Sequence, residues 1–169
     1  MALEEVQPGV AADGNGLVVF VPVLEDPSKP KVTELTGSGV IPLTYGLTPD
    51  GFTHDTSVAT ITSGRWTLAQ ALELDGVITD TVELKYVWEG TEDDIVRTAL
   101  TKGTKGFLVK RLAVPNATAF AAAQLVTVIP VQASIQRDVP PAANTELQKI
   151  QKMNVIGEVH RDVAVVAGP

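Results

Sequence analysis

The 169-residue chain contains no cysteine, and its only histidines are His54 and His160. The first absence excludes disulfide scaffolds, cysteine-ligated zinc sites and thiol nucleophiles. With only two histidines, a histidine-rich metal site is also excluded. Aromatic residues make up only 5% of the chain. We expect both tryptophans, Trp66 and Trp88, to face the core, which argues against an aromatic platform for binding sugars.

Long apolar runs are also missing. The longest, residues 17–24, is far too short to span a bilayer. The first residues, Met-Ala-Leu-Glu-Glu, lack the basic stretch of a secretory leader. We therefore expect a protein that is made and folded in a cytosol, with no membrane partner. The 44% apolar and 20% charged residues are typical of a globular protein, and the length fits a single domain over residues 1–169.

Charge is unevenly distributed along the chain, whose net charge is −7. Residues 1–100 carry 16 acidic and 5 basic side chains, whereas residues 101–169 carry 4 acidic and 8 basic ones. A protein that binds free duplex DNA usually has a surplus of Lys and Arg, and this chain has the reverse. The opposite signs of the two halves could help identical copies to meet head to tail. Ordinary variation of surface charge along a chain is the alternative interpretation.

Most of the chain is predicted to form strands, since Val, Ile and Thr are abundant and Gly and Pro recur at short intervals. A glycine-rich start predicts a flexible N-terminal arm over residues 1–16, followed by a strand over residues 17–23. Prolines and glycines favour a loop over residues 25–38 and a longer loop over residues 44–56.

The clearest strand pair is predicted around Asp75 and Gly76, which we expect to form a two-residue turn. On both sides of this turn, polar and apolar residues alternate with period two, as in a sheet with one buried and one exposed face. Asp80 is the one polar residue on the apolar face of the second strand. The polar face of the two strands contains Glu73, Thr79, Thr81, Glu83 and Lys85.

One helix is predicted, over residues 92–101. Thr91 is a suitable N-cap residue, and the acidic residues that follow it suit the positive end of a helix dipole. Gly103 is expected to end the helix. The sequence thus predicts a mainly β protein, a β-sandwich or barrel flanked by one α-helix.

The C-terminal third is predicted to contain strands over residues 107–114 and 125–137, and Pro130 indicates an edge strand or a bulge in the second. Residues 145–153 fit either a helix or a strand. The ending, from residue 155, alternates as a strand. A strand from 145 to 166 would be about 70 Å long, which is longer than a compact domain of this size is wide. We therefore expect it to bend at Gly157 or to reach another copy of the chain.

No set of residues predicts catalysis, a metal or a cofactor. His160 and Asp162 share a strand face, but no Ser or Cys nucleophile accompanies them. The Gly- and Lys-containing run at 101–106 lacks the spacing of a phosphate-binding loop. We therefore expect no enzyme activity, although a hydrolase stays as a minor alternative.

Several segments together resemble the major tail proteins of long-tailed bacteriophages, which are the subunits of the tail tube. The resemblance rests on the order of the predicted strand pair and helix, and on four segments: residues 106–111 (GFLVKR), 128–132 (VIPVQ), 140–150 (PPAANTELQKI) and 156–166 (IGEVHRDVAVV). It covers residues 65–167, and the first 60 residues show no match.

This resemblance implies a virion protein of the tail, made in the host cytoplasm, whose copies form rings, expected to be hexameric, that stack into a tube. The genome would pass through without specific binding. Partners would be other copies and the tape measure, terminator and distal tail proteins. Residues Glu73, Thr79, Thr81, Glu83 and Lys85 are candidates for an acidic lumen that repels DNA, against the alternative of an ordinary solvated sheet face. The other functions considered are a tail terminator, the inner tube of a contractile injection device and a ligand-binding β-sandwich decoration domain.

Overall fold

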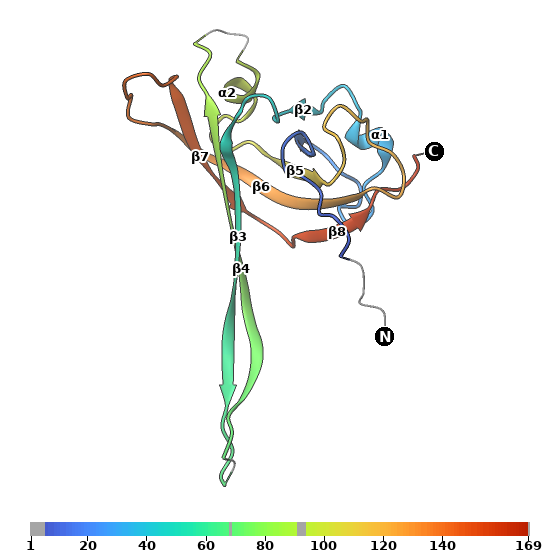
Figure 1. Ribbon diagram of the computed structural model, residues 1–169, viewed down its shortest axis with the longest axis vertical. Coiled ribbons are helices and arrows are strands. Elements are labelled where there is room, and N and C mark those ends of the chain that lie inside the picture. Colours follow the sequence, from blue (N-terminus) through green and yellow to red (C-terminus); the bar gives the residue numbers. More distant parts are fainter. Residues whose placement is uncertain (1–5, 68, 91–93, 169) are drawn as a thin grey trace.

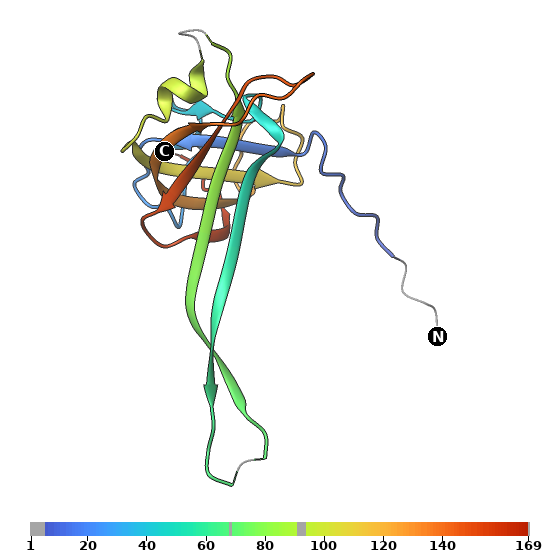
Figure 2. The same ribbon diagram turned by 90° about the vertical axis from the view of Figure 1, so that its left-hand side faces the viewer.

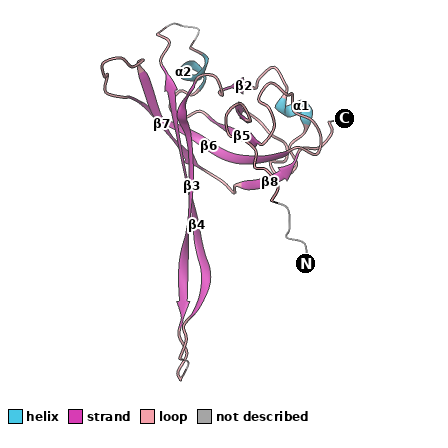
Figure 3. Ribbon diagram, in the orientation of Figure 1, coloured by secondary structure: helices cyan, strands magenta, loops and turns pink. Residues whose placement is uncertain are grey.

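The computed structural model describes residues 6–67, 69–90 and 94–168, which contain eight strands and two short helices. Figures 1 and 3 show their arrangement. In chain order the elements are β1 (Gly16–Val21), α1 (Val32–Leu35), β2 (Ile41–Pro42), β3 (Leu47–Ser63), β4 (Leu72–Val87), α2 (Ile95–Ala99), β5 (Lys105–Leu112), β6 (Leu125–Asp138), β7 (Gln148–Val155) and β8 (His160–Ala164). The prediction of a mainly β fold is confirmed.

The strands form one sheet in the order β2-β1-β5-β6-β7-β4-β3, and β8 also pairs with β6. The partner of β6 changes along its length, because Val128 pairs with β8 whereas Val131 pairs with β7. Pro130 lies at this change, where its carbonyl accepts a hydrogen bond from the Ile156 amide at 3.0 Å. The expectation that Pro130 marks an edge strand is wrong, since β6 is central. A proline is tolerated there because the ladder is interrupted at that point.

The C-terminal segment bends as predicted. Strand β7 ends at Val155 and β8 begins at His160, so one long strand is divided at Gly157. A Cβ at Gly157 would lie only 3.0 Å from Cγ of Pro130, which explains why a residue without a side chain occupies the bend. Residues 148–153, for which the sequence left helix and strand open, belong to β7.

Two apolar clusters form the core of what we call the body, the described chain apart from residues 57–79. One cluster lies between β1, β5 and β6 on one side and β4 and β7 on the other, and includes Phe20, Leu84 and Met153. The second covers the opposite face of β1, β5 and β6 and includes Leu35 and Phe120. Strand β1 is therefore buried on both faces, which explains its unbroken apolar run.

Helix α2 is shorter than predicted. It spans Ile95–Ala99, and its N-cap is Asp94, whose carboxylate accepts the amide hydrogen bond of Arg97 at 3.1 Å. The predicted cap Thr91 and the first predicted helical residues, 92 and 93, lie outside the described residues. The predicted loop over residues 25–38 contains a second helix, α1, in which Glu34 accepts the Lys31 amide hydrogen bond at 2.9 Å.

The predicted turn at Asp75 and Gly76 is wrong. Both residues lie inside β4, which pairs with β3, and the chain reverses between Ser63 and Leu72. Val58 pairs with Ile78 but Thr60 pairs with Asp75, so β4 has one extra residue at this point and forms a β-bulge. A Cβ at Gly76 would lie 2.8 Å from the Ala59 carbonyl oxygen. The glycine is needed for close approach in a bulge, not for a turn.

The predicted long loop over residues 44–56 is also wrong for most of its length, since β3 begins at Leu47. Pro49 and Gly51, two of the residues that suggested a loop, lie in an irregular stretch between Leu47, which pairs with Tyr86, and Phe52, which pairs with Leu84. A Cβ at Gly51 would lie 2.3 Å from the Lys85 carbonyl oxygen, so glycine again permits two backbones to approach.

Candidate functional site: the distal hairpin and the cleft at its base

The most prominent feature outside the body is the far end of the β3–β4 pair, residues 57–79, which we call the distal hairpin. Pairing of β4 with β7 stops at Val82, and from there β3 and β4 pair only with each other. Figures 1 and 2 show this ribbon projecting from the body. Large apolar side chains on it are more than 40% exposed: Val58, Ile61, Trp66, Leu72, Leu74, Val77 and Ile78.

Trp66 was expected in the core, but it lies near the tip of this hairpin and is 96% exposed. Trp88 is 38% exposed, and the Lys149 ammonium lies 4.5 Å from its ring centroid. Monomeric soluble proteins rarely expose large apolar patches, whereas seven large apolar side chains are exposed on this one hairpin. The uncovered apolar residues therefore indicate that the distal hairpin is an interaction surface.

The bulge at Gly76 decides which side chains share a face of the distal hairpin. Residues that pair across an antiparallel ladder lie on the same face. Glu73 pairs with Thr62 and Asp75 with Thr60, so both acidic residues lie on the face of Val58. This is the face that carries Val82 and Leu84 in the body. Glu73 is thus on the opposite face from Glu83, which contradicts its predicted grouping.

The remaining predicted lumen residues lie together. Thr79, Thr81, Glu83 and Lys85 alternate along β4 on the face that points away from the core. Glu83 and Lys85 belong to the four-stranded part of the sheet β6-β7-β4-β3, Thr81 lies one residue beyond the end of β4–β7 pairing, and Thr79 lies on the distal hairpin. We call the outward surface of these four strands the outer face of the sheet.

Ion pairs balance the charge of this outer face. Glu83 pairs across the ladder with Lys152 and accepts a hydrogen bond from Arg137 at 3.2 Å. Lys85 donates to Asp50 at 3.0 Å, and hydrogen bonds from Lys85 and Thr48 hold the pKa of Asp50 below its usual value. The surface is therefore mixed in charge, unlike the acidic surface that the sequence suggested.

At the base of the distal hairpin, Asp80 joins three segments of the chain. Its Oδ1 accepts a hydrogen bond from Thr56 at 2.6 Å, lies 3.0 Å from His54 Nε2 and forms an ion pair with Arg161 of β8. The His54 and Asp80 side chains are only 7% and 9% exposed. Burial tends to raise the pKa of Asp80, but hydrogen bonds from Thr56, Arg161 and His54 outweigh it and leave the pKa lowered.

These contacts fasten the hairpin to β8. In the sequence, His54 falls in the predicted loop over residues 44–56 and has no visible connection with Asp80 or Arg161. The signal that could have found the cluster was Asp80 itself, the single polar residue on an otherwise apolar strand face. A carboxylate in such a position needs partners from another element.

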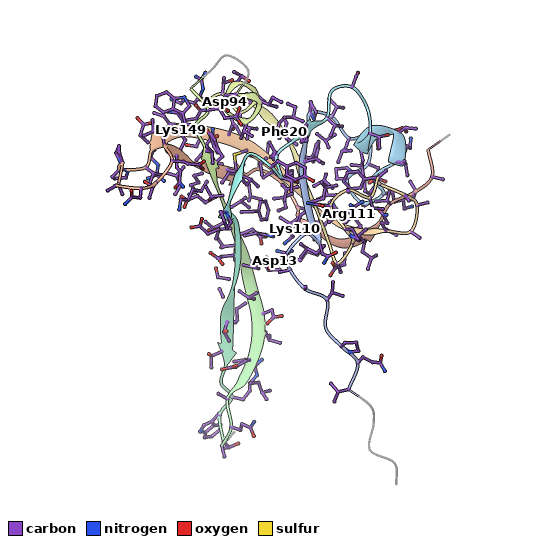
Figure 4. All side chains as sticks on the ribbon, turned by 45° about the horizontal axis from the view of Figure 1, so that its top comes forward. Asp13, Phe20, Asp94, Lys110, Arg111 and Lys149 are labelled. Carbon is purple, nitrogen blue, oxygen red and sulfur yellow. The ribbon has the colours of Figure 1, made fainter. Side chains whose placement is uncertain are left out.

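A cleft of about 490 Å³ opens beside this cluster. Its floor is formed by Lys110 and Leu112 of β5 with Leu125 and Thr127 of β6, and its wall includes Arg161. Figure 4 shows Lys110 near the base of the hairpin. Leu112 and Leu125 are 58% and 55% exposed, so the floor offers an apolar pair beside a cation.

Arg111, the neighbour of Lys110, points to the other side of β5 and is fully buried. Its guanidinium donates to the carbonyl oxygens of Pro115, Ala119 and Thr118 and to the side chain of Gln124, at distances of 2.7–3.1 Å. Burial lowers the pKa of Arg111. This residue fixes the loop between β5 and β6 and is a structural group.

Within the described ranges, no cluster of three His, Asp or Glu side chains could hold a metal ion. No helix among the described residues is long and apolar enough to cross a membrane.

A family described as phage tail tube protein matches residues 5–168. Among solved structures, a chain in the six-fold symmetrised cryo-EM structure of the anti-feeding prophage baseplate superposes with a TM-score of 0.52 and 12% identity, covering 92% of this chain and 95% of that one. This likeness supports the fold. The crystal structure of an Hcp protein gives a TM-score of 0.39 and 10% identity, with 83% and 88% of the two chains covered. No curated protein sequence matches the chain.

Proposed function

Because the chain belongs to the phage tail tube protein family, we propose that its copies join side by side into closed rings and that these rings stack into a tube. Membership makes the protein a structural component of the virion tail and not an enzyme, in agreement with the sequence-based expectation. The proposal extends this to the strands that meet between copies and to the surface that lines the bore.

The observation that carries the proposal is a pair of unpaired strand edges. Among the described residues, β3 pairs only with β4, which leaves its other edge open from Leu47 to Ser63. On the far side of the same four strands, pairing of β6 with β5 stops at Gln132, so residues 134–138 lack a strand partner there. Exposed edges invite pairing with another chain. Joining β3 of one copy to the end of β6 in the next would remove both edges in a ring.

We propose that the four strands β6-β7-β4-β3 line the bore with their outer face. If six copies each contributed four strands, roughly 24 strands at about 4.8 Å spacing would enclose a barrel about 37 Å in diameter before tilt. Thr81, Glu83 and Lys85 would then face the lumen, with Thr79 at its margin and Glu73 outside this set.

Such a lumen would be balanced in charge, not acidic. Tight binding of DNA depends on cations that replace counterions at the phosphates. Here Lys85 and Arg137 already have carboxylate partners in Asp50 and Glu83. The genome could therefore pass without being held, in the way that an acidic lumen was expected to allow. Neighbours in the virion would include tape measure, terminator and distal tail proteins.

Electron microscopy of the purified protein across a concentration series tests this function. We expect ring-shaped end views and tubes that lengthen as concentration rises, with a parallel increase in light scattering. Single rings without tubes would favour the tail terminator, whose copies close but do not stack. A monomer at the highest concentration, with no lateral association, would overturn the proposal.

A further inference from the structure

The cleft beside the hairpin base contains a lysine without a hydrogen-bond acceptor among the described residues. The Lys110 ammonium lies 5.5 Å from the centroid of the Phe52 ring, and no ion pair of Lys110 is found in this part of the chain. Burial lowers the pKa of Lys110, and the nearby Arg161 lowers it further, while Asp162 opposes both. Asp162, which also lines the cleft, forms no ion pair with Lys110 among the described residues, and Asp80 is engaged by Arg161, His54 and Thr56. An anionic group entering the cleft would supply what Lys110 lacks.

A matching surface exists on the distal hairpin. The face that carries Asp75 and Glu73 also carries the pair Val58 and Ile78, and neither acidic side chain has an ion-pair partner among the described residues. Val58, which pairs with Ile78, and Thr60, which pairs with Asp75, are two positions apart on β3. On the cleft floor Leu112 and Lys110 are also two positions apart. Since two strand residues span about 7 Å, an apolar pair and a charge are spaced alike on both surfaces.

A hairpin cannot fill the cleft of its own chain. The cleft wall includes Thr56, whereas Asp75 pairs with Thr60 and Glu73 with Thr62. Along an extended strand these acidic residues therefore lie about 13 Å and 20 Å beyond the wall. The straight ribbon in Figures 1 and 2 leads away from the body, so a second copy has to provide the occupant.

We propose that the cleft receives the acidic face of the distal hairpin of a second copy, so that Glu73 or Asp75 accepts a hydrogen bond from Lys110 while Val58 and Ile78 cover Leu112 and Leu125. This inference rests on the proposed assembly and names one of its contacts. Lys110 belongs to the basic part of the chain, residues 101–169, and Glu73 and Asp75 belong to the acidic part, residues 1–100. The contact therefore joins two regions of opposite net charge. It also gives the exposed apolar pairs on both surfaces a partner.

The first test uses assembled wild-type protein and a zero-length carbodiimide cross-linker, which joins a lysine to a carboxylate in direct contact. Tubes are formed from equal amounts of unlabelled and ¹⁵N-labelled protein, so that mass spectrometry separates links between copies from links within one. We expect mixed-isotope peptides that join Lys110 to Glu73 or Asp75. Coupling of Lys110 only to other carboxylates, or no coupling in intact tubes, would overturn the inference.

The second test reverses the charges. Lys110→Glu alone, and Glu73→Lys with Asp75→Lys alone, should each raise the concentration needed for tube formation by tenfold or more. Combining all three substitutions should restore most of the loss. Lys29→Glu is the control, since it makes the same change at an exposed lysine outside the cleft and away from the two strand edges of the proposed ring, and it should assemble normally.

Thermal unfolding of the unassembled variants establishes that each one folds. Normal assembly of Lys110→Glu, or no rescue in a folded triple variant, would refute the contact. The proposed function is tested separately, because wild-type protein that forms no tubes refutes the assembly itself, whereas tubes without the cross-link refute only this contact.

Discussion

Strands β3 and β4 run through both the body and the distal hairpin, and their two portions differ in what covers their side chains. Along β4, Val82, Leu84 and Tyr86 are fully buried in the apolar cluster that faces β1, β5 and β6, whereas Leu72 and Leu74 are 54% and 61% exposed. Both stretches alternate polar and apolar residues, so the alternation alone does not distinguish them. What differs is the cover, because β1, β5 and β6 pack on the body portion of β4, whereas beyond Val82 β4 pairs only with β3. An apolar strand face without a cover in its own chain is suited to one supplied by another chain.

Matched leucine substitutions should give the largest contrast between the two regions. Leu108→Ala, at a fully buried position, is expected to lower the free energy of unfolding by about 2–5 kcal/mol, because it removes packed methyl groups and leaves a cavity. Leu74→Ala on the distal hairpin should change it by no more than about 0.5 kcal/mol. Urea unfolding of unassembled protein measures both. Equal losses would show that the hairpin is part of the folded core.

A substitution at Asp80, whose contacts link the distal hairpin to the body, should have a smaller effect. Asp80→Asn keeps the shape of the side chain but weakens three contacts, and we expect a loss of about 1–3 kcal/mol. Because the pKa of Asp80 is lowered by folding, its ionisation stabilises the protein above about pH 4, and this contribution is lost as the pH falls through the lowered pKa.

The stability difference between wild type and Asp80→Asn should therefore shrink as the pH is lowered from 5 towards 2. Urea unfolding at a series of pH values would measure this trend. A difference that stays constant over the range would mean that the Asp80 charge does not contribute. Faster amide exchange at Thr56 in the variant would locate the change at the hairpin base.

Removal of residues 1–14 should affect the fold still less. Residues 6–13 are exposed and extend from the body in Figure 2, and the Gly14 carbonyl accepts one backbone hydrogen bond, from Asn116 at 2.8 Å. We expect a loss of about 1 kcal/mol, which is the value of one such bond. The truncated subunit should fold but fail to form long tubes. Normal tubes in electron micrographs of the truncated protein would contradict this expectation.

The smallest effect is expected at the outer face of the sheet. Glu83→Gln removes one charge of an exposed pair with Arg137, and exposed pairs contribute about 0–1 kcal/mol. The free energy of unfolding should therefore change by less than about 1 kcal/mol, and this difference from the wild type should shrink as salt is added in urea-unfolding measurements. A larger loss would mean that the ion pairs of this face help to hold the four strands together.

The sequence predicted element types better than their connections. Strands around residues 107–112 and 125–137, the helix at 95–99 and the bend at Gly157 follow from local patterns, because alternation, capping and glycine act over a few residues. The errors at residues 44–56 and at Asp75 and Gly76 share one cause. Glycine and proline signal turns, but they also occur where two backbones approach closely or a strand bulges, and only the partner strand distinguishes these cases.

The candidate site was partly visible in the sequence. Thr79, Thr81, Glu83 and Lys85 share a face because strand periodicity is exact over seven residues. Glu73 does not join them, since a single inserted residue at Gly76 exchanges the two faces beyond it. The contact of Asp80 with Arg161 spans 81 positions and has no local signal. Likewise, the cleft needs β3, β5, β6 and β8 together.

The amino-acid sequence by itself determined that this protein is a mainly β chain of single-domain length that contains no thiol. The order of its segments was also enough to indicate its family. Those properties depend on composition and on neighbours along the chain. Only the tertiary structure decided which half of the long hairpin is buried, how β6 divides its partners and where Lys110 and the acidic hairpin face lie. Burial and register depend on contacts between distant residues, and these exist only once the sheet has formed.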